Sequence, residues 1–194
     1  TQHYHSQFQH EQKLKPHTMK KITGIIVIAF VMLIGGSVFS PAFSQAKKKA
    51  NKDTENWRYE VECAGIGKEG TYLIKVWSYS KKPQVAMEQS KKNAVHAIIF
   101  QGFAGGAQGC TSQKALTNNS ALEQEKADFF KEFFADGGKY MKYVSSANDG
   151  AIGEGDRVKV GKEYKVGVIV TVFKDNLRKD LEDAGIVKGL NSGF

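Results

Sequence analysis

The stretch RVKVGKEYKVGVIVTVF, residues 157–173, constrains the fold more than any other part of the chain. Two sets of side chains alternate within it, as they do in a β-strand, where successive side chains point to opposite faces. One set is Tyr164, Val166, Val168, Val170 and Val172, and the other is Lys165, Gly167, Ile169, Thr171 and Phe173. Both sets are rich in β-branched residues, which is typical of a central strand with both faces partly covered. We therefore predict a sheet built around one long strand in this stretch.

Three further segments have the pattern of strands. Residues 57–63 alternate aromatic and apolar side chains with charged ones, and residues 71–80 are rich in aromatic and β-branched residues. The glycines of residues 64–70 lie between these segments and favour a turn, so the two predict an antiparallel hairpin. Residues 139–146 predict a short strand, and a glycine-containing loop at 148–156 follows it.

Two segments between these strands have the pattern of helices. Pro83 favours the start of a helix over residues 83–103. Proline has no backbone N–H, and an N–H in the first turn of a helix would have no partner within the helix, so nothing is lost there. Residues 120–138 predict a second helix. Ser120 is its expected N-cap, and Glu123, three residues later, would complete a capping box.

A last helix is predicted directly after the valine-rich strand, over residues 176–184, with Asp175 as its cap and Gly185 as its end. The side chains expected to face inward are Leu177, Leu181 and Ala184. The order of elements is then strand, strand, helix, helix, strand, strand, helix. An antiparallel sheet with helices packed on one face is a two-layer α+β fold.

Residues 19–44 have the composition of a secretory signal peptide. Two lysines precede an apolar stretch that ends near Ile34, and the small-residue pattern Ala42-Phe43-Ser44 follows it. The apolar stretch is shorter than the about 20 residues that a membrane-spanning helix needs. We therefore expect cleavage after Ser44 and no membrane span in the remainder, and a retained anchor is the alternative. The expected location is the periplasm, the outer membrane or the medium.

The rest of the chain divides at similar changes in composition. Residues 1–18 precede the leader and are expected to be an upstream segment outside the fold. Residues 45–56 form a basic linker, residues 57–188 a single α+β domain, and residues 189–194 a loose tail. Four of the 28 Lys and Arg residues and one of the 20 Asp and Glu residues precede residue 45, which leaves the remainder with a net charge of +5. This mild, dispersed charge argues against a nucleic-acid partner.

His96 is the single histidine after residue 44, and that fact excludes more chemistry than any other count. Catalytic zinc sites usually take several His or carboxylate ligands, and a Ser-His-Asp triad needs a well-placed base. We expect His96 on the surface or edge of its helix rather than in a catalytic role. The sequence predicts no catalytic residue, no metal and no cofactor.

Cys63 and Cys110 are the two cysteines of the chain. An oxidising compartment would allow them to form a disulfide. In the alternative, Cys63 is a small buried apolar residue and Cys110 a free thiol. A free Cys110 activated by His96 would be the sharpest enzymatic hypothesis.

Three features of the chain together resemble one known family. They are the glycines of AGIGKEG after the first strand, the small residues along the first helix, and the valine-rich strand that runs into KDNLRKDLEDAG; the small residues are Ala86, Ser90, Ala94 and Ala97. This pattern resembles the twenty-kilodalton outer-membrane lipoprotein family and the N-terminal domain of the flagellar T-ring assembly protein. The resemblance covers most of residues 57–185 and implies an envelope module that assembles with or binds other envelope proteins. Lipid-anchored members carry a cysteine at the signal exit, and this chain has none there.

We therefore expect a non-enzymatic module of the bacterial envelope whose partners are other envelope proteins or a second copy of the chain. Trp77 and Tyr79 are candidate contact residues, and the alternative is that they pack under the helices. Two other functions are left open: a small exported enzyme with Cys110 as nucleophile, and a module that binds an envelope glycan or small ligand beside the glycine loop.

Overall fold

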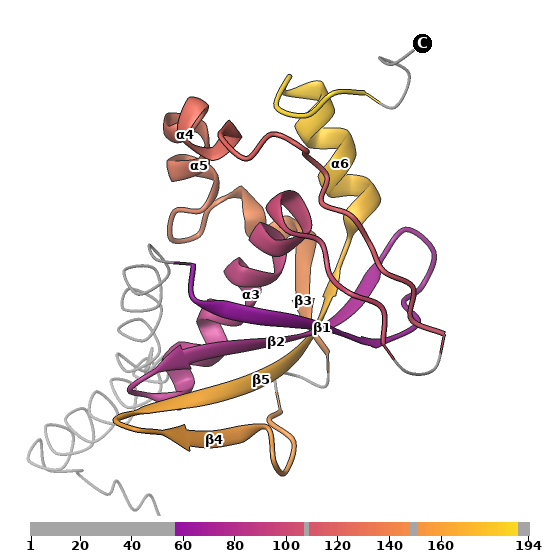
Figure 1. Cartoon of the computed structure of the whole chain (residues 1–194). Coiled ribbons are helices and arrows are strands. Elements are labelled where there is room, and N and C mark those ends of the chain that lie inside the picture. The colour runs from indigo at the N-terminus through magenta and orange to yellow at the C-terminus, as the bar shows by residue number, and fades with distance from the viewer. Residues whose placement is uncertain (1–56, 107–108, 148–150, 190–194) are drawn as a thin grey trace, which may run out of the picture. The chain divides into compact units, whose positions relative to one another are not determined.

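The valine-rich stretch contains β5, Glu163–Val172, the central strand of a five-stranded antiparallel sheet (Figure 1). The computed structural model describes residues 57–106, 109–147 and 151–189, which all belong to one of two compact units of the chain. The predicted upstream segment, leader and basic linker lie outside the described residues. The other strands are β1 Tyr59–Gly65, β2 Tyr72–Ser80, β3 Val144–Ser146 and β4 Arg157–Val160.

The strand order is β1-β2-β5-β3, and β4 pairs with β5. The predicted hairpin is confirmed, because β1 and β2 pair in antiparallel fashion. The long stretch 157–173 differs from the prediction of a single strand, since it forms the hairpin β4–β5 with Gly161 at the turn. The φ angle of Gly161 is 61°, a left-handed conformation that glycine adopts at little cost.

The core lies between the sheet and α3, Pro83–Phe100, which packs against β2 and β5 on one face (Figure 1). Proline stands at the start of this helix, as predicted. The four small residues of the predicted stripe, Ala86, Ser90, Ala94 and Ala97, are all fully buried. Small side chains allow the helix to approach the sheet closely, so that the inward valines of β5 and the isoleucines of α3 meet. The α+β fold class is therefore confirmed.

The segment predicted as one helix over 120–138 contains two short ones, α4 Leu122–Glu125 and α5 Ala127–Phe133. The predicted capping box is wrong, because the N-cap of α4 is Ala121 and no side chain caps it there. Instead, the N–H of Ala121 donates to Oδ1 of Asn119 at 2.9 Å. The predicted apolar face is confirmed, since Phe130, Phe133 and Phe134 are all buried.

The chain after α5 differs from the prediction in a similar way. A short 3-10 helix, η2 Lys139–Tyr143, occupies most of the expected strand at 139–146, and only its end forms β3. The last helix, α6 Lys174–Asp183, begins two residues earlier than predicted, so that Asp175 lies in its first turn rather than at its cap. Among the described residues, no helix is both long and apolar enough to cross a membrane.

Gly185 follows the end of α6 as predicted, with a φ angle of 66°. Leu177 and Leu181 are buried, but Ala184 is exposed. The chain just after this helix still packs on it, because Val187 is buried and its N–H donates to the carbonyl of Leu181.

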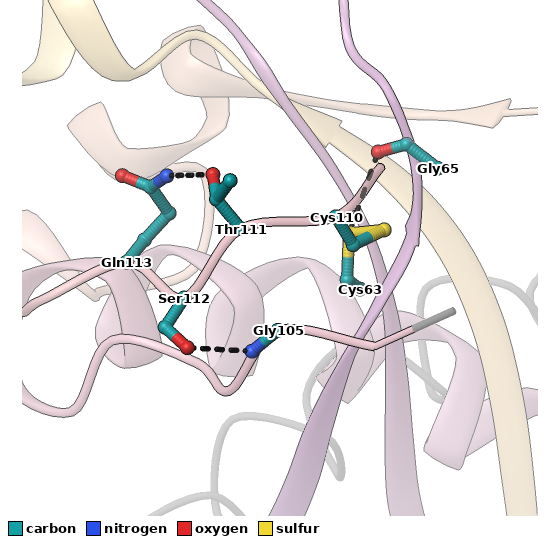
Figure 2. Close-up of a disulfide and its surroundings, with 7 residues drawn as sticks. All are labelled: Cys63, Gly65, Gly105, Cys110, Thr111, Ser112 and Gln113. Atoms are coloured by element: carbon teal, nitrogen blue, oxygen red, sulfur yellow. Dashed lines mark hydrogen bonds between the residues drawn. A yellow bond between two sulfur atoms is a disulfide. The ribbon is translucent and has the colours of Figure 1, made fainter. Parts of the chain in front are cut away.

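A disulfide between Cys63 and Cys110 joins the end of β1 to the glycine-rich loop after α3 (Figure 2). The two Cα atoms are 6.1 Å apart. Further contacts hold the same loop, since the Gly105 N–H donates to Ser112 Oγ at 2.9 Å. The Tyr72 hydroxyl donates to Gln113 Oε1 at 2.8 Å. The glycine loop is thus fastened to the sheet at more than one point.

We predict that replacing both cysteines (Cys63→Ser with Cys110→Ser) lowers the free energy of unfolding by about 2–4 kcal/mol. The closed loop spans a separation of 47 residues, and the chain-entropy model assigns about 4 kcal/mol to a loop of that length. Urea unfolding of oxidised wild type and of the double variant measures the difference. Reductant should destabilise only the wild type, and equal stabilities without reductant would contradict the prediction.

Candidate functional site

The side chains of β2 divide between the two faces of the sheet. Ile74 and Val76 are fully buried on the face that α3 covers. Trp77 and Tyr79 alternate with them and therefore lie on the opposite face. The alternative expectation, that these aromatic residues pack under the helices, is wrong. No helix in the described part of the chain packs against this second face.

We call this second face the open face. The register of the strands places side chains from four segments on it. Its residues include Glu60 and Glu62 on β1, Lys75, Trp77 and Tyr79 on β2, Val158 and Val160 on β4, and Glu163, Lys165, Gly167 and Ile169 on β5. Arg58, just before β1, reaches the same face through its ion pair with Glu163.

Trp77 is held on the open face by contacts on several sides. Its Nε1–H donates to Glu62 Oε1 at 2.9 Å. The ammonium groups of Lys75 and Lys165 lie 5.4 and 5.1 Å from its ring centroid, within the range of cation–π attraction. Gly167 stands opposite Trp77 in the β2–β5 register. A Cβ at Gly167 would lie 2.9 Å from the indole, so this glycine provides the space for the ring.

Tyr79 lies beside two ion pairs that join β5 to Arg58, which immediately precedes β1, and to Glu60 on β1. Arg58 pairs with Glu163, and its guanidinium carbon is 4.7 Å from the Tyr79 ring centroid. Lys165 pairs with Glu60 at 2.7 Å, and the Tyr79 hydroxyl also donates to Glu60. The hydrogen bond from Lys165, and to a smaller extent the one from Tyr79, holds the pKa of Glu60 below its ordinary value. The carboxylate is therefore charged at neutral pH and keeps both partners in place.

A shallow groove of about 390 Å³ opens at the same end of the sheet. Its lining is Arg58, Tyr59, Glu60, Tyr79, Val160 and Glu163. Aromatic and apolar surface is therefore exposed beside fixed charges. Such a combination can bind a side chain of another molecule.

We predict that Gly167→Ala destabilises the protein by about 1–3 kcal/mol, because the added methyl group must displace the Trp77 ring. Urea unfolding measures the loss. Gly106→Ala is the matched control, since nothing lies within 4 Å of a Cβ there. If Gly167→Ala were as stable as Gly106→Ala, the ring would not depend on the space at Gly167.

A second cluster surrounds His96, and the sequence did not predict it. His96 is only 4% exposed, which corrects the expectation of a surface position on the helix. The indole of Trp57 stacks on the imidazole with 3.6 Å between the ring centroids. His96 Nε2 lies 3.3 Å from Glu123 Oε2, and Nδ1 lies 2.6 Å from the Tyr59 hydroxyl. The Trp57 indole N–H donates to the other oxygen of Glu123 at 2.8 Å.

These partners define the state of the imidazole. A charged carboxylate only accepts hydrogen bonds, so Nε2 of His96 carries the hydrogen and Nδ1 accepts from the hydroxyl of Tyr59. Burial lowers the pKa of His96 to about 4, although Glu123 acts in the opposite direction. Burial also raises the pKa of Tyr59 far above its usual value. With 5% of its side chain exposed, His96 joins β1, α3 and α4 and has little access to a substrate.

We predict that stability falls as the pH decreases from 6.5 to 4. The folded pKa of His96, about 4, is below the unfolded value of about 6.5. The unfolded state therefore binds more protons in this window, and about 3 kcal/mol of stability present above pH 6.5 is lost by pH 4. Urea unfolding as a function of pH measures the slope. His96→Gln should have a shallower slope, and equal slopes would contradict the assignment.

The structure separates the residues of the enzymatic hypothesis. Cys110 is bonded to Cys63, and His96 is bonded to Tyr59 and Glu123, so no Cys110–His96 dyad forms. Within the described ranges, no group of three His, Cys, Asp or Glu side chains is placed to hold a metal ion. Part of the His96 cluster could have been predicted from the alternation of residues 57–63, because this pattern places Trp57 and Tyr59 on one side of the predicted strand.

Comparisons with known proteins return no family model, no curated protein and no solved structure that matches the chain. The resemblance to the outer-membrane lipoprotein family and to the T-ring protein therefore stays a prediction.

Proposed function

We propose that the chain is an exported, non-enzymatic module of the bacterial envelope that binds other proteins through the open face. One observation carries the proposal. Val158 and Val160 on this face are 47% and 48% exposed, and Trp77 and Tyr79 lie on the same face with no helix of the described chain packed over them. Apolar and aromatic side chains gathered on one uncovered face favour an interaction site.

The contacts of the two aromatic residues support the same role. Tryptophan and tyrosine are over-represented among the residues that dominate binding energy at protein interfaces. Trp77 is fixed by Glu62 and Gly167, and Tyr79 by Glu60. Side chains that are already ordered lose little conformational entropy when a partner binds. The aromatic side chains of the open face are thus already ordered in the unbound protein.

The disulfide supports the expected location. Bonds of this kind persist in oxidising compartments such as the periplasm and the extracellular space. The predicted leader at residues 19–44 would bring the chain there. The non-enzymatic part of the proposal is supported by the positions of Cys110 and His96, since the first is oxidised and the second is buried.

Site-specific photocrosslinking in cells tests the proposal. We predict that a photoreactive phenylalanine analogue at Tyr79 forms adducts with discrete envelope proteins, and that the same analogue at Met141 does not. Met141 is a suitable control because it is apolar, 40% exposed and located on η2.

The proteins captured at Tyr79 are then purified and their affinity is measured directly. Trp77→Ala with Tyr79→Ala should weaken binding at least tenfold, provided that thermal unfolding shows the variant to be folded. Identical adducts from positions 79 and 141, or an affinity that the double substitution leaves unchanged, would overturn the proposal.

A further inference from the structure

The strand β4 has a neighbour on one side only, because it pairs with β5 and with no other described strand. The Gly167 N–H donates to the carbonyl of Asp156 at 2.8 Å, just before β4 begins. In an antiparallel ladder the hydrogen-bonded pairs recur at every second residue. The next such pairs are Val158 with Lys165 and Val160 with Glu163. The backbone N–H and C=O groups of Arg157 and Lys159 therefore point away from β5, toward the free edge.

The side chains of β4 differ between its two faces. Val158 and Val160 lie on the open face and are about half exposed. Arg157 and Lys159 lie on the opposite face and are also exposed. Neither cation has an ion pair or side-chain hydrogen bond to the described part of the chain. This edge thus combines backbone groups directed outward with one apolar row and one cationic row.

The other edge of the sheet, β1, lacks these features. Its register shifts between Cys63 and Gly65, and the disulfide attaches the glycine loop at the same place. Its charged side chains are also engaged, since Glu60 and Glu62 already accept hydrogen bonds from Tyr79 and Trp77. A regular edge with unpaired charge is therefore found at β4.

We propose that β4 accepts an extended segment of a partner protein in which apolar and acidic residues alternate, and that this segment adds to the sheet as a further strand. In the added strand, one row of side chains lies beside Val158 and Val160, and the other lies beside Arg157 and Lys159. Main-chain hydrogen bonds supply affinity, and the two rows supply specificity. This inference rests on the proposed binding function and names the chemistry of the partner.

The charges of β4 decide between an acidic partner and a second copy of this chain. Symmetric antiparallel pairing of two β4 strands would place Arg157 and Lys159 of one copy beside the same residues of the other. Like charges on directly opposite residues are destabilising, and cations on an edge strand commonly prevent self-association. Glutamate or aspartate at the facing positions would instead pair with these cations.

Peptide binding to the purified protein tests the inference. The protein is purified from the cells that produce it, in its processed form and with the disulfide intact. The probe is a capped eight-residue peptide of alternating valine and glutamate. The first control peptide has the same composition in two blocks, and the second alternates valine and lysine. Amide hydrogen exchange and NMR shifts report on the N–H groups of residues 157 and 159.

The alternating acidic peptide should protect these two N–H groups from exchange, and neither control peptide should do so. Arg157→Glu with Lys159→Glu should weaken binding of the acidic peptide at least tenfold and create binding to the valine–lysine peptide. Lys131→Glu, on the exposed surface of α5, is the matched charge control and should change nothing.

One comparison separates strand addition from simple charge attraction. Lys159→Pro removes the outward N–H and leaves the β4–β5 hydrogen bonds intact, whereas Lys159→Ala removes only the charge. Strand addition requires the proline variant to bind at least threefold more weakly than the alanine variant. Equal binding by these variants, equal binding of the block peptide, or dimerisation through β4 in light scattering would each overturn the inference. Loss of peptide binding while adducts at Tyr79 persist would overturn this inference alone and leave the proposed function standing.

Discussion

The pairing of β2 with β5 is the contact on which the rest of the structure depends. Its register sets Ile74 opposite Val170 and Val76 opposite Val168, and these four side chains are buried against α3. A shift by one residue would exchange the two faces of β2 and carry Trp77 into the core. Gly167 opposes such a shift, because it gives the indole ring space that a residue with a side chain would fill.

The same register divides the charged residues into two groups. Glu60, Glu62 and Lys165 interact with one another and with the aromatic side chains of β2, so they maintain the open face and have little freedom to meet a partner. Arg157 and Lys159 stand on the outer strand, beyond the reach of those carboxylates. The first group therefore fixes the aromatic side chains of the open face, and the two cations of β4 can attract an acidic partner.

The amino-acid sequence predicts the features that local chemistry decides. Pro83 and Gly185 correctly predicted ends of helices, and the alternating valines predicted the central strand. The hairpin at Gly161 was missed because β4 has only four residues and its alternation is continuous with that of β5. The burial of His96 depends on Trp57, which reaches it only through the tertiary fold. Alternation likewise placed Trp77 and Tyr79 together but could not tell which face α3 covers.

The His96 cluster, which the sequence did not predict, and the disulfide, which it offered as one of two alternatives, have a common physical effect on β1. At its start, Trp57 and Tyr59 attach the strand to α3 and α4 through His96 and Glu123. At its end, Cys63 attaches it to the glycine loop. An edge strand closed at both ends resists pairing with another chain, since a new strand needs a continuous row of free backbone groups. These attachments oppose strand addition at β1, whereas β4 combines a regular outer side with the cations Arg157 and Lys159, which are unpaired within the described part of the chain.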